Sequence, residues 1–167
     1  MSSRFFRFAP FLIAIGLLVG SSSAALADGH GDHSEKDAAH TKYRQSVMGA
    51  IGSHMGSLGG IMKNGLVLPG HVEAHAGLLA ENAKLVAAAF KHQSSKGATD
   101  AKPNIWTDWS GFEEDIADFE KAARDLEAAA ASGDRKAVGP AMKALGKSCG
   151  GCHESYRKPK EESYKNK

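Results

Sequence analysis

Residues 135–156 read RKAVGPAMKALGKSCGGCHESY. Apolar side chains and both cysteines of the chain recur there at steps of four, three, four, three and four, at Val138, Met142, Leu145, Cys149, Cys152 and Tyr156. A stripe that repeats every 3.5 residues on average predicts a helix that packs against other helices at a shallow angle. The stretch therefore predicts a helical bundle with both cysteines on its buried side.

Cys149, Cys152 and His153 form a CxxCH motif, whose spacing is typical of c-type haem attachment. On a helix the three residues fall at i, i+3 and i+4 and share one face. The two thiols would bind one haem c covalently, and His153 would be the proximal ligand of its iron. A zinc site needs four ligands and a thioredoxin-like motif needs a βαβ unit, so a plain dithiol or a disulfide remains as the alternative.

Three further segments carry apolar stripes with helical spacing, and they predict helices over about 38–63, 70–92 and 109–131. The polar stretch 94–104 predicts a loop, and Ser132-Gly133-Asp134 predicts a turn with Asp134 as the next N-cap. No segment alternates with period 2 for long enough to form a strand. The fold class is therefore all-α, an antiparallel four-helix bundle with covalent haem c.

Two features disturb this pattern. Gly139-Pro140 predicts a kink in the last helix or a true start at Pro140. The first helix contains several glycines, each costing about 1 kcal/mol relative to alanine; they are Gly49, Gly52, Gly56, Gly59 and Gly60. Close approach of a haem or of a neighbouring helix would offset this cost, and simple tolerance of the glycines is the alternative.

The N-terminus predicts a secretory signal over residues 1–27. Arg4 and Arg7 precede the short apolar run 11–20, and an A-x-A site ends at Ala27. The run is shorter than the roughly 20 residues that a membrane-spanning helix needs, although a membrane anchor is the alternative. Export would place the mature protein in the periplasm.

The remaining boundaries follow from composition. Residues 28–37 lack apolar periodicity and predict a flexible His-rich arm, with metal binding as a weaker alternative. The haem-binding domain would then span 38–158 and a basic C-terminal tail 159–167. Of the 21 basic residues, two lie in the predicted signal, so 19 remain against 19 acidic ones. This balance argues against a nucleic-acid partner, which needs a basic face.

Both ends of the predicted domain resemble class II cytochromes c. KSCGGCHESYR at 147–157 places the CxxCH motif near the C-terminus, and YRQSVM at 43–48 is similar to the family's first-helix pattern. Ile105-Trp106 and the acidic helix after Asp108 also match. The resemblance covers about residues 38 to 158. It implies a four-helix bundle with a single haem c.

The family has two branches that differ at the position of Met48. In the cytochrome c-556-like branch a methionine there ligates the iron, which gives a six-coordinate electron carrier. In the cytochrome c prime branch a bulky residue shields an open distal face, and the five-coordinate iron binds nitric oxide or carbon monoxide. Met48 favours a one-electron carrier with His153/Met48 ligation that serves periplasmic redox partner proteins, and gas binding is the alternative. His75 is the histidine alternative to Met48.

The resemblance also suggests roles for residues around the haem. It implies that Arg44 pairs with a haem propionate, the alternative being an exposed arginine in the first helical turn. Arg157 would support the haem edge, or else complement the helix dipole. Trp106 and Trp109 should pack the preceding loop onto the bundle. A homodimer through the first two helices is a further expectation. Without a distal histidine–arginine pair, a peroxidase is the weakest alternative, and we predict no enzyme activity.

Overall fold

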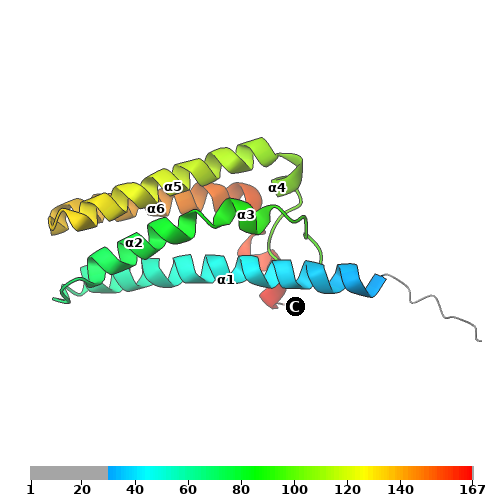
Figure 1. Ribbon diagram of the computed structural model, residues 1–167, viewed down its shortest axis with the longest axis horizontal. Helices are drawn as coiled ribbons and strands as arrows, with labels where there is room; N and C mark the ends of the chain where they lie inside the picture. The colour runs from blue at the N-terminus through cyan, green and yellow to red at the C-terminus, as the bar shows by residue number, and fades with distance from the viewer. Residues whose placement is uncertain (1–29, 167) are drawn as a thin grey trace, which may run out of the picture.

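The computed structural model describes residues 30–166, which form a bundle of four long helices (Figure 1). The long helices are α1 (His30–Lys63), α2 (His71–Ala83), α5 (Trp109–Ala131) and α6 (Arg135–Tyr156). The short ones are α3 (Val86–Phe90), α4 (Asn104–Thr107) and the 3₁₀ helices η1 (Lys160–Glu162) and η2 (Tyr164–Asn166). Successive long helices run in opposite directions, so the predicted all-α antiparallel bundle is confirmed.

The contacts between neighbouring long helices are unequal. α1 packs on α2, α2 on α5, and α5 on α6, whereas α1 and α6 make very little direct contact. The predicted stripe of α5 is buried throughout, at Phe112, Ile116, Phe119, Ala123, Leu126 and Ala130. Full burial of one large apolar side chain contributes about 1.5–3 kcal/mol, so α5 anchors the bundle. The weak α1–α6 pairing leaves room between these two helices.

Helix α1 begins at His30 and not near residue 38, so residues 30–37, which the sequence places in a flexible arm, form the first turns of the helix. The first turns of α1 are tied to the segment that follows α3. Asp37 Oδ1 lies 2.6 Å from His92 Nε2, and the Ser94 hydroxyl donates a hydrogen bond to the Asp37 carbonyl. The predicted signal, residues 1–27, lies outside the described residues. None of the helices between residues 30 and 166 is long and apolar enough to cross a membrane.

The predicted second helix is divided into α2 and α3 at Lys84-Leu85. The side-chain amide of Asn82 donates to the Leu78 carbonyl at 2.7 Å, and the Leu85 N–H bonds to the Asn82 carbonyl three residues back. Asparagine side chains compete in this way for the carbonyls of a helix. The i to i+3 bond then tightens the chain and ends α2 at Ala83.

Helix α6 begins at Arg135, so the alternative start at Pro140 is wrong. Asp134 is its N-cap, as predicted, because the carboxylate accepts a hydrogen bond from the Lys136 N–H at 2.9 Å. Pro140 lies inside the helix, where its missing N–H leaves a single carbonyl, that of Lys136, without a helical donor. The whole CxxCH motif therefore lies on one regular helix.

Gly111, in the first turn of α5, makes room for a bond that joins α5 to the end of α6. The Tyr156 hydroxyl donates to Asp108 Oδ2 at 2.8 Å, and a Cβ on Gly111 would lie 2.8 Å from that hydroxyl oxygen. We expect Gly111→Ala to lower the free energy of unfolding by about 1–3 kcal/mol, because the clash outweighs the gain in helix propensity of at most ~1 kcal/mol.

Urea unfolding of the holoprotein, followed by circular dichroism, measures this change. Gly59→Ala is the matched control, because a Cβ there would meet nothing within 4 Å and should raise stability. Equal stabilisation by both substitutions would contradict the proposed clash.

Candidate functional site

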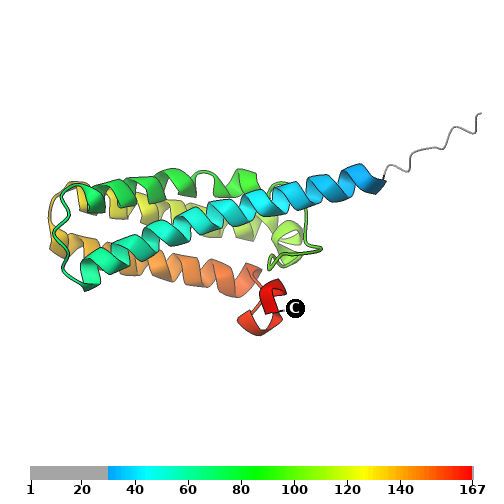
Figure 2. The same cartoon turned by 90° about the horizontal axis from the view of Figure 1, so that it is seen from below.

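A cavity of about 640 Å³ lies between α1 and α6, the two long helices that barely touch. Cys149, Cys152 and His153 line it from α6, while Met48 and Gly52 line it from α1. Figure 2 shows the course of both helices along the bundle. The volume falls within the roughly 300–1,000 Å³ typical of cofactor and ligand sites. The fold thus brings the CxxCH motif and Met48, which are far apart in the sequence, to one cavity.

The two cysteines are half-buried on the α6 wall of the cavity. As free thiols their pKa values are raised by burial, that of Cys152 to about 11 with further contributions from Asp115 and Cys149. Reactive dithiols instead need a lowered pKa, because the thiolate is the nucleophile. These raised pKa values are those of unreactive thiols and do not support redox chemistry at the motif.

His153 also lines the cavity, one turn before Arg157. Burial among protein atoms lowers the pKa of His153, and the charge of Arg157 lowers it further. A neutral imidazole is the form that binds a metal ion. The Arg157 guanidinium lies 3.5 Å from Asp100 Oδ2, so it is paired within the protein at the cavity edge. Its predicted contact with the haem edge stays a prediction.

The α1 wall is unusually open because of its glycines. Gly49, Gly52 and Gly56 line the cavity, and a Cβ on any of them would meet nothing within 4 Å. Close approach of another helix within residues 30–166 is therefore not their explanation. A flat wall without side chains, opposite two thiols and a histidine, fits a planar macrocycle held on α6. The residues present thus fit a covalent haem c.

Met48 is half-buried and faces this cavity, together with Met55. The buried apolar residues of α1 are Val47, Ile51, Leu58 and Ile61. His75 is not among the residues that line the cavity, because its ring faces α1, with Nδ1 3.0 Å from His54 Nδ1. Of the two residues considered as distal ligands, only Met48 is brought to the site.

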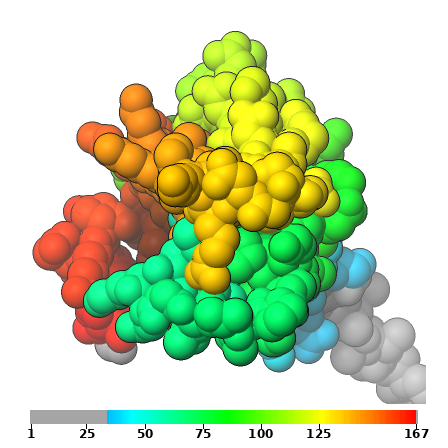
Figure 3. Space-filling model, turned by 90° about the vertical axis from the view of Figure 1, so that its left-hand side faces the viewer, coloured from blue at the N-terminus to red at the C-terminus, as the bar shows by residue number. Residues whose placement is uncertain are grey.

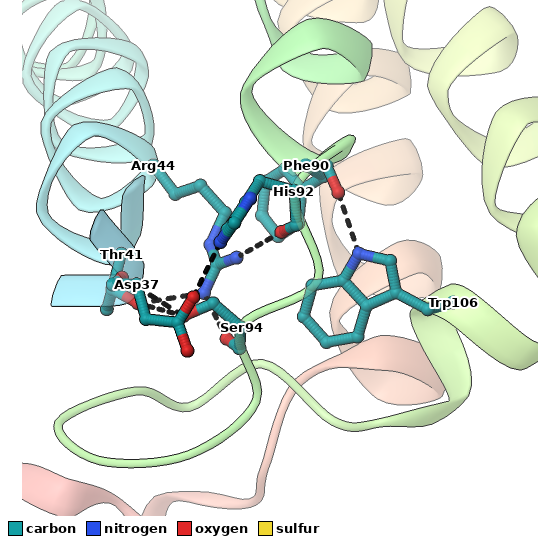
Figure 4. Close-up of polar contacts among 7 residues, drawn as sticks. All are labelled: Asp37, Thr41, Arg44, Phe90, His92, Ser94 and Trp106. Atoms are coloured by element: carbon teal, nitrogen blue, oxygen red, sulfur yellow. Dashed lines mark hydrogen bonds and ion pairs between the residues drawn. The ribbon is translucent and has the colours of Figure 1, made fainter. Parts of the chain in front are cut away.

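Arg44 is buried, with 2% of its surface exposed, beside the cavity (Figure 4). Its guanidinium donates hydrogen bonds to the carbonyls of His92 and Ser94 and to the Thr41 hydroxyl. The alternative of an exposed first-turn arginine is wrong, because α1 starts more than three turns earlier and the 92–94 segment covers Arg44. The predicted contact with a propionate stays a prediction.

Two aromatic rings complete the surroundings of Arg44. The guanidinium carbon lies 5.3 Å from the ring centroids of both Phe90 and Trp106, a distance suited to cation–π contact. The Trp106 indole N–H also donates to the Phe90 carbonyl at 2.8 Å, which confirms that Trp106 packs the loop onto the bundle. Burial lowers the pKa of Arg44, and the charge of Asp37 opposes this shift.

Sequence reasoning missed several residues that line the cavity. Asp100 comes from the loop before α4, and Tyr164 and Lys165 come from the C-terminal end that composition marked only as a basic tail. Tyr164, the one aromatic residue after α6, was the only signal in the sequence that this end could bury a side chain.

Comparison with known proteins agrees with this geometry. Residues 39–157 match the family model for cytochrome c'. The chain is 36% identical over 120 residues to a cytochrome c' of Pararhodospirillum photometricum, covering 71% of this chain and 96% of that protein. The fold is similar to cytochrome c prime from Shewanella frigidimarina, with a TM-score of 0.69 and 31% identity over 74% of this chain and 97% of the other.

A nitric oxide complex of a variant of cytochrome c prime from Alcaligenes xylosoxidans is also similar, with a TM-score of 0.68 and 32% identity over 74% of this chain and 97% of that one. The matched region contains both walls of the cavity and the motif cysteines at positions 149 and 152. The family binds a covalent haem c and is not enzymatic. On fold, motif and sequence alike, this chain belongs to the cytochrome c' family of class II haem proteins.

Proposed function

We propose that the protein binds nitric oxide at a five-coordinate haem iron, with His153 as its proximal ligand and the α1 side open to the gas. The observation that carries this proposal is the glycine wall: next to Met48, the face of α1 opposite His153 is bare at Gly49 and Gly52. That space suits a diatomic ligand. The similar cytochrome c prime with bound nitric oxide supports the same assignment.

The polar side chains of α1 that reach the cavity already donate hydrogen bonds to backbone carbonyls. Gln45 Nε2 donates to the Ala98 carbonyl at 2.7 Å, and Arg44 is held by the 92–94 segment. Haem supplies an iron that binds diatomic gases, and the α1 wall offers it apolar surroundings. Nitric oxide and carbon monoxide need no hydrogen bond from the protein in such a site, whereas bound dioxygen is favoured by distal donors. We therefore propose nitric oxide or carbon monoxide, and not dioxygen, as the gas that binds here.

A second candidate is an electron carrier in which Met48 ligates the iron. Its support is that a thioether suited to haem iron faces the cavity from α1. Absorption and electron paramagnetic resonance spectra of the ferric holoprotein distinguish the two. A high-spin spectrum, with carbon monoxide binding after reduction, is expected for the gas-binding protein. A low-spin spectrum with a thioether-to-iron charge-transfer band would overturn it in favour of Met48 ligation.

Met48→Ala sharpens this test. If Met48 only shields the open face, the ferric spin state should stay the same while carbon monoxide binds the ferrous protein about tenfold faster, a barrier change of roughly 1.4 kcal/mol. Stopped-flow absorption measures the rate. Met62→Ala is the matched control, because Met62 is also half-buried on α1 but does not line the cavity. A change from low to high spin in Met48→Ala would instead identify Met48 as a ligand.

We also propose that the protein works in the periplasm after removal of residues 1–27. The thiol chemistry of c-type haem attachment belongs to exported proteins, and the family supports that location. Redox partner proteins and a homodimer through the first two helices remain predictions. Cell fractionation combined with the mass of the mature N-terminus, expected at Asp28, tests the location.

A further inference from the structure

The C-terminal segment, residues 159–166, folds back beside the bundle instead of extending from it. After α6 it forms η1 and η2, and Figures 1 and 2 show it turning back near the end of α6. In the end view of Figure 3 it forms a separate lobe next to α1 and α6. The family match ends at residue 157, so this segment lies outside the matched region.

Asp100 holds the segment in place through both oxygens of its carboxylate. Oδ2 accepts a hydrogen bond from the Ser163 hydroxyl, and Oδ1 accepts one from the Tyr164 N–H, both at 3.0 Å. Burial alone would raise the pKa of Asp100, but these two hydrogen bonds and the charge of Arg157 outweigh it and lower that pKa. Ser163 itself is buried. The carboxylate is therefore ionised and committed to this segment.

Hydrogen bonds from Lys158 fix the start of the segment to the same loop. The Lys158 N–H donates to the Asp100 carbonyl at 2.7 Å, and the Lys158 ammonium donates to the Thr99 carbonyl at 3.0 Å. The backbones of Ala101 and Arg157 form an isolated antiparallel β-bridge next to these two hydrogen bonds. The segment is thus attached both where it leaves α6 and at Ser163-Tyr164, which leaves little freedom for the residues between.

This attachment brings Tyr164 and Lys165 to the cavity, where both are lining residues. Three cations line the cavity, and two of them are engaged: Arg44 by backbone carbonyls and Arg157 by Asp100. The Lys165 ammonium lies 6.0 Å from the Tyr164 ring and, among the described residues, has no carboxylate or carbonyl acceptor. A haem carries two propionates, which are anions that need such a partner or water.

We propose that the C-terminal segment is part of the haem site. Asp100 is the positioning residue that docks the segment, Tyr164 covers one edge of the haem, and Lys165 binds a propionate. The proposal extends the haem site beyond the region shared with the family. It does not depend on gas binding, because it concerns the edge of the haem and not the face opposite His153.

The first test is amide hydrogen exchange in the holoprotein, which reports docking without using any ligand. The Tyr164 amide should be protected in the wild type and should exchange at least about tenfold faster in Asp100→Asn, since one amide oxygen cannot replace two carboxylate oxygens. Asp118→Asn, which removes an exposed carboxylate of α5, is the matched control. Exchange at the random-coil rate in the wild type would overturn the docking of the segment.

The second test is the reduction potential, which a merely structural role for Lys165 would not move. A cation beside a propionate disfavours the extra positive charge of ferric haem, so Lys165→Gln should lower the potential. Lys160→Gln, on the same segment but outside the cavity lining, should change it less. The Lys165→Gln shift should also disappear in an Asp100→Asn background. Equal shifts for the two lysine variants, or a shift that survives in that background, would overturn the propionate assignment.

Discussion

We expect the variant in which Cys149 and Cys152 are both replaced by serine to carry no covalent haem, even when it is produced with a working c-type maturation system. The two thiols are the only ones in the chain and lie on one wall of the cavity, so no other residue can form a thioether. Intact mass under denaturing conditions, together with a haem stain of the denatured protein, measures attachment. Each single serine variant should keep one thioether bond, and covalent haem in the double variant would contradict the assignment.

The same double variant should lose much of its stability. Helices α1 and α6 barely touch, and without haem the apolar lining of the cavity of about 640 Å³ between them would be left exposed to water. Burial of apolar surface is the main stabilising contribution in a domain whose whole free energy of unfolding is about 5–15 kcal/mol, so we expect α1 to collapse onto α6 or to detach. Circular dichroism and hydrogen exchange of α1 amides measure this. Native protection of α1 in the double variant would contradict it.

Arg44→Met should lower the free energy of unfolding by about 3 kcal/mol. The substitution leaves the buried carbonyls of His92 and Ser94 without a donor, which costs about 1–3 kcal/mol, and removes cation–π contacts worth about 0.5–2 kcal/mol. Methionine has nearly the same helix propensity and keeps most of the volume, so the change isolates the guanidinium. Urea unfolding of the holoprotein gives the value.

Arg124→Met on α5 is the matched control. Arg124 is exposed, and its guanidinium forms only a surface ion pair with Glu120 at 3.4 Å, so its loss should cost less than about 0.5 kcal/mol. Arg44→Lys should fall between the two, because one ammonium cannot replace the planar fork that reaches both carbonyls. Similar stability of the Arg44 and Arg124 methionine variants would contradict the anchoring role of Arg44.

Local patterns in the sequence were sufficient to predict the helices and the chemistry of haem attachment. The stripe of α5 is buried as predicted, Asp134 caps α6, and the cysteines line a cavity. These predictions depend on neighbours within one or two helical turns, where spacing alone sets direction. The division of the second helix at Lys84 was a local feature too, but it depended on which way the Asn82 side chain turned.

The surroundings of the haem depended on contacts between distant parts of the chain. The acceptors of Arg44 lie 48 and 50 residues further on, and Asp100 meets Ser163 across 63 residues. A hydrogen-bond partner at such a distance is chosen by packing, which periodicity does not encode. The early start of α1 has the same origin, because Asp37 and the 92–94 segment hold helical turns whose composition is that of a flexible arm.

The sequence alone therefore determined that a helical chain would hold a haem on its last helix, because helical spacing and thiol chemistry are properties of neighbouring residues. Only the tertiary structure decided what encloses that haem. It placed Met48 and a bare glycine face opposite His153, buried Arg44, and turned the basic tail into a wall of the cavity. The physical reason is that a cavity is defined by what the surrounding elements leave unfilled, and this is fixed only when all of them are packed.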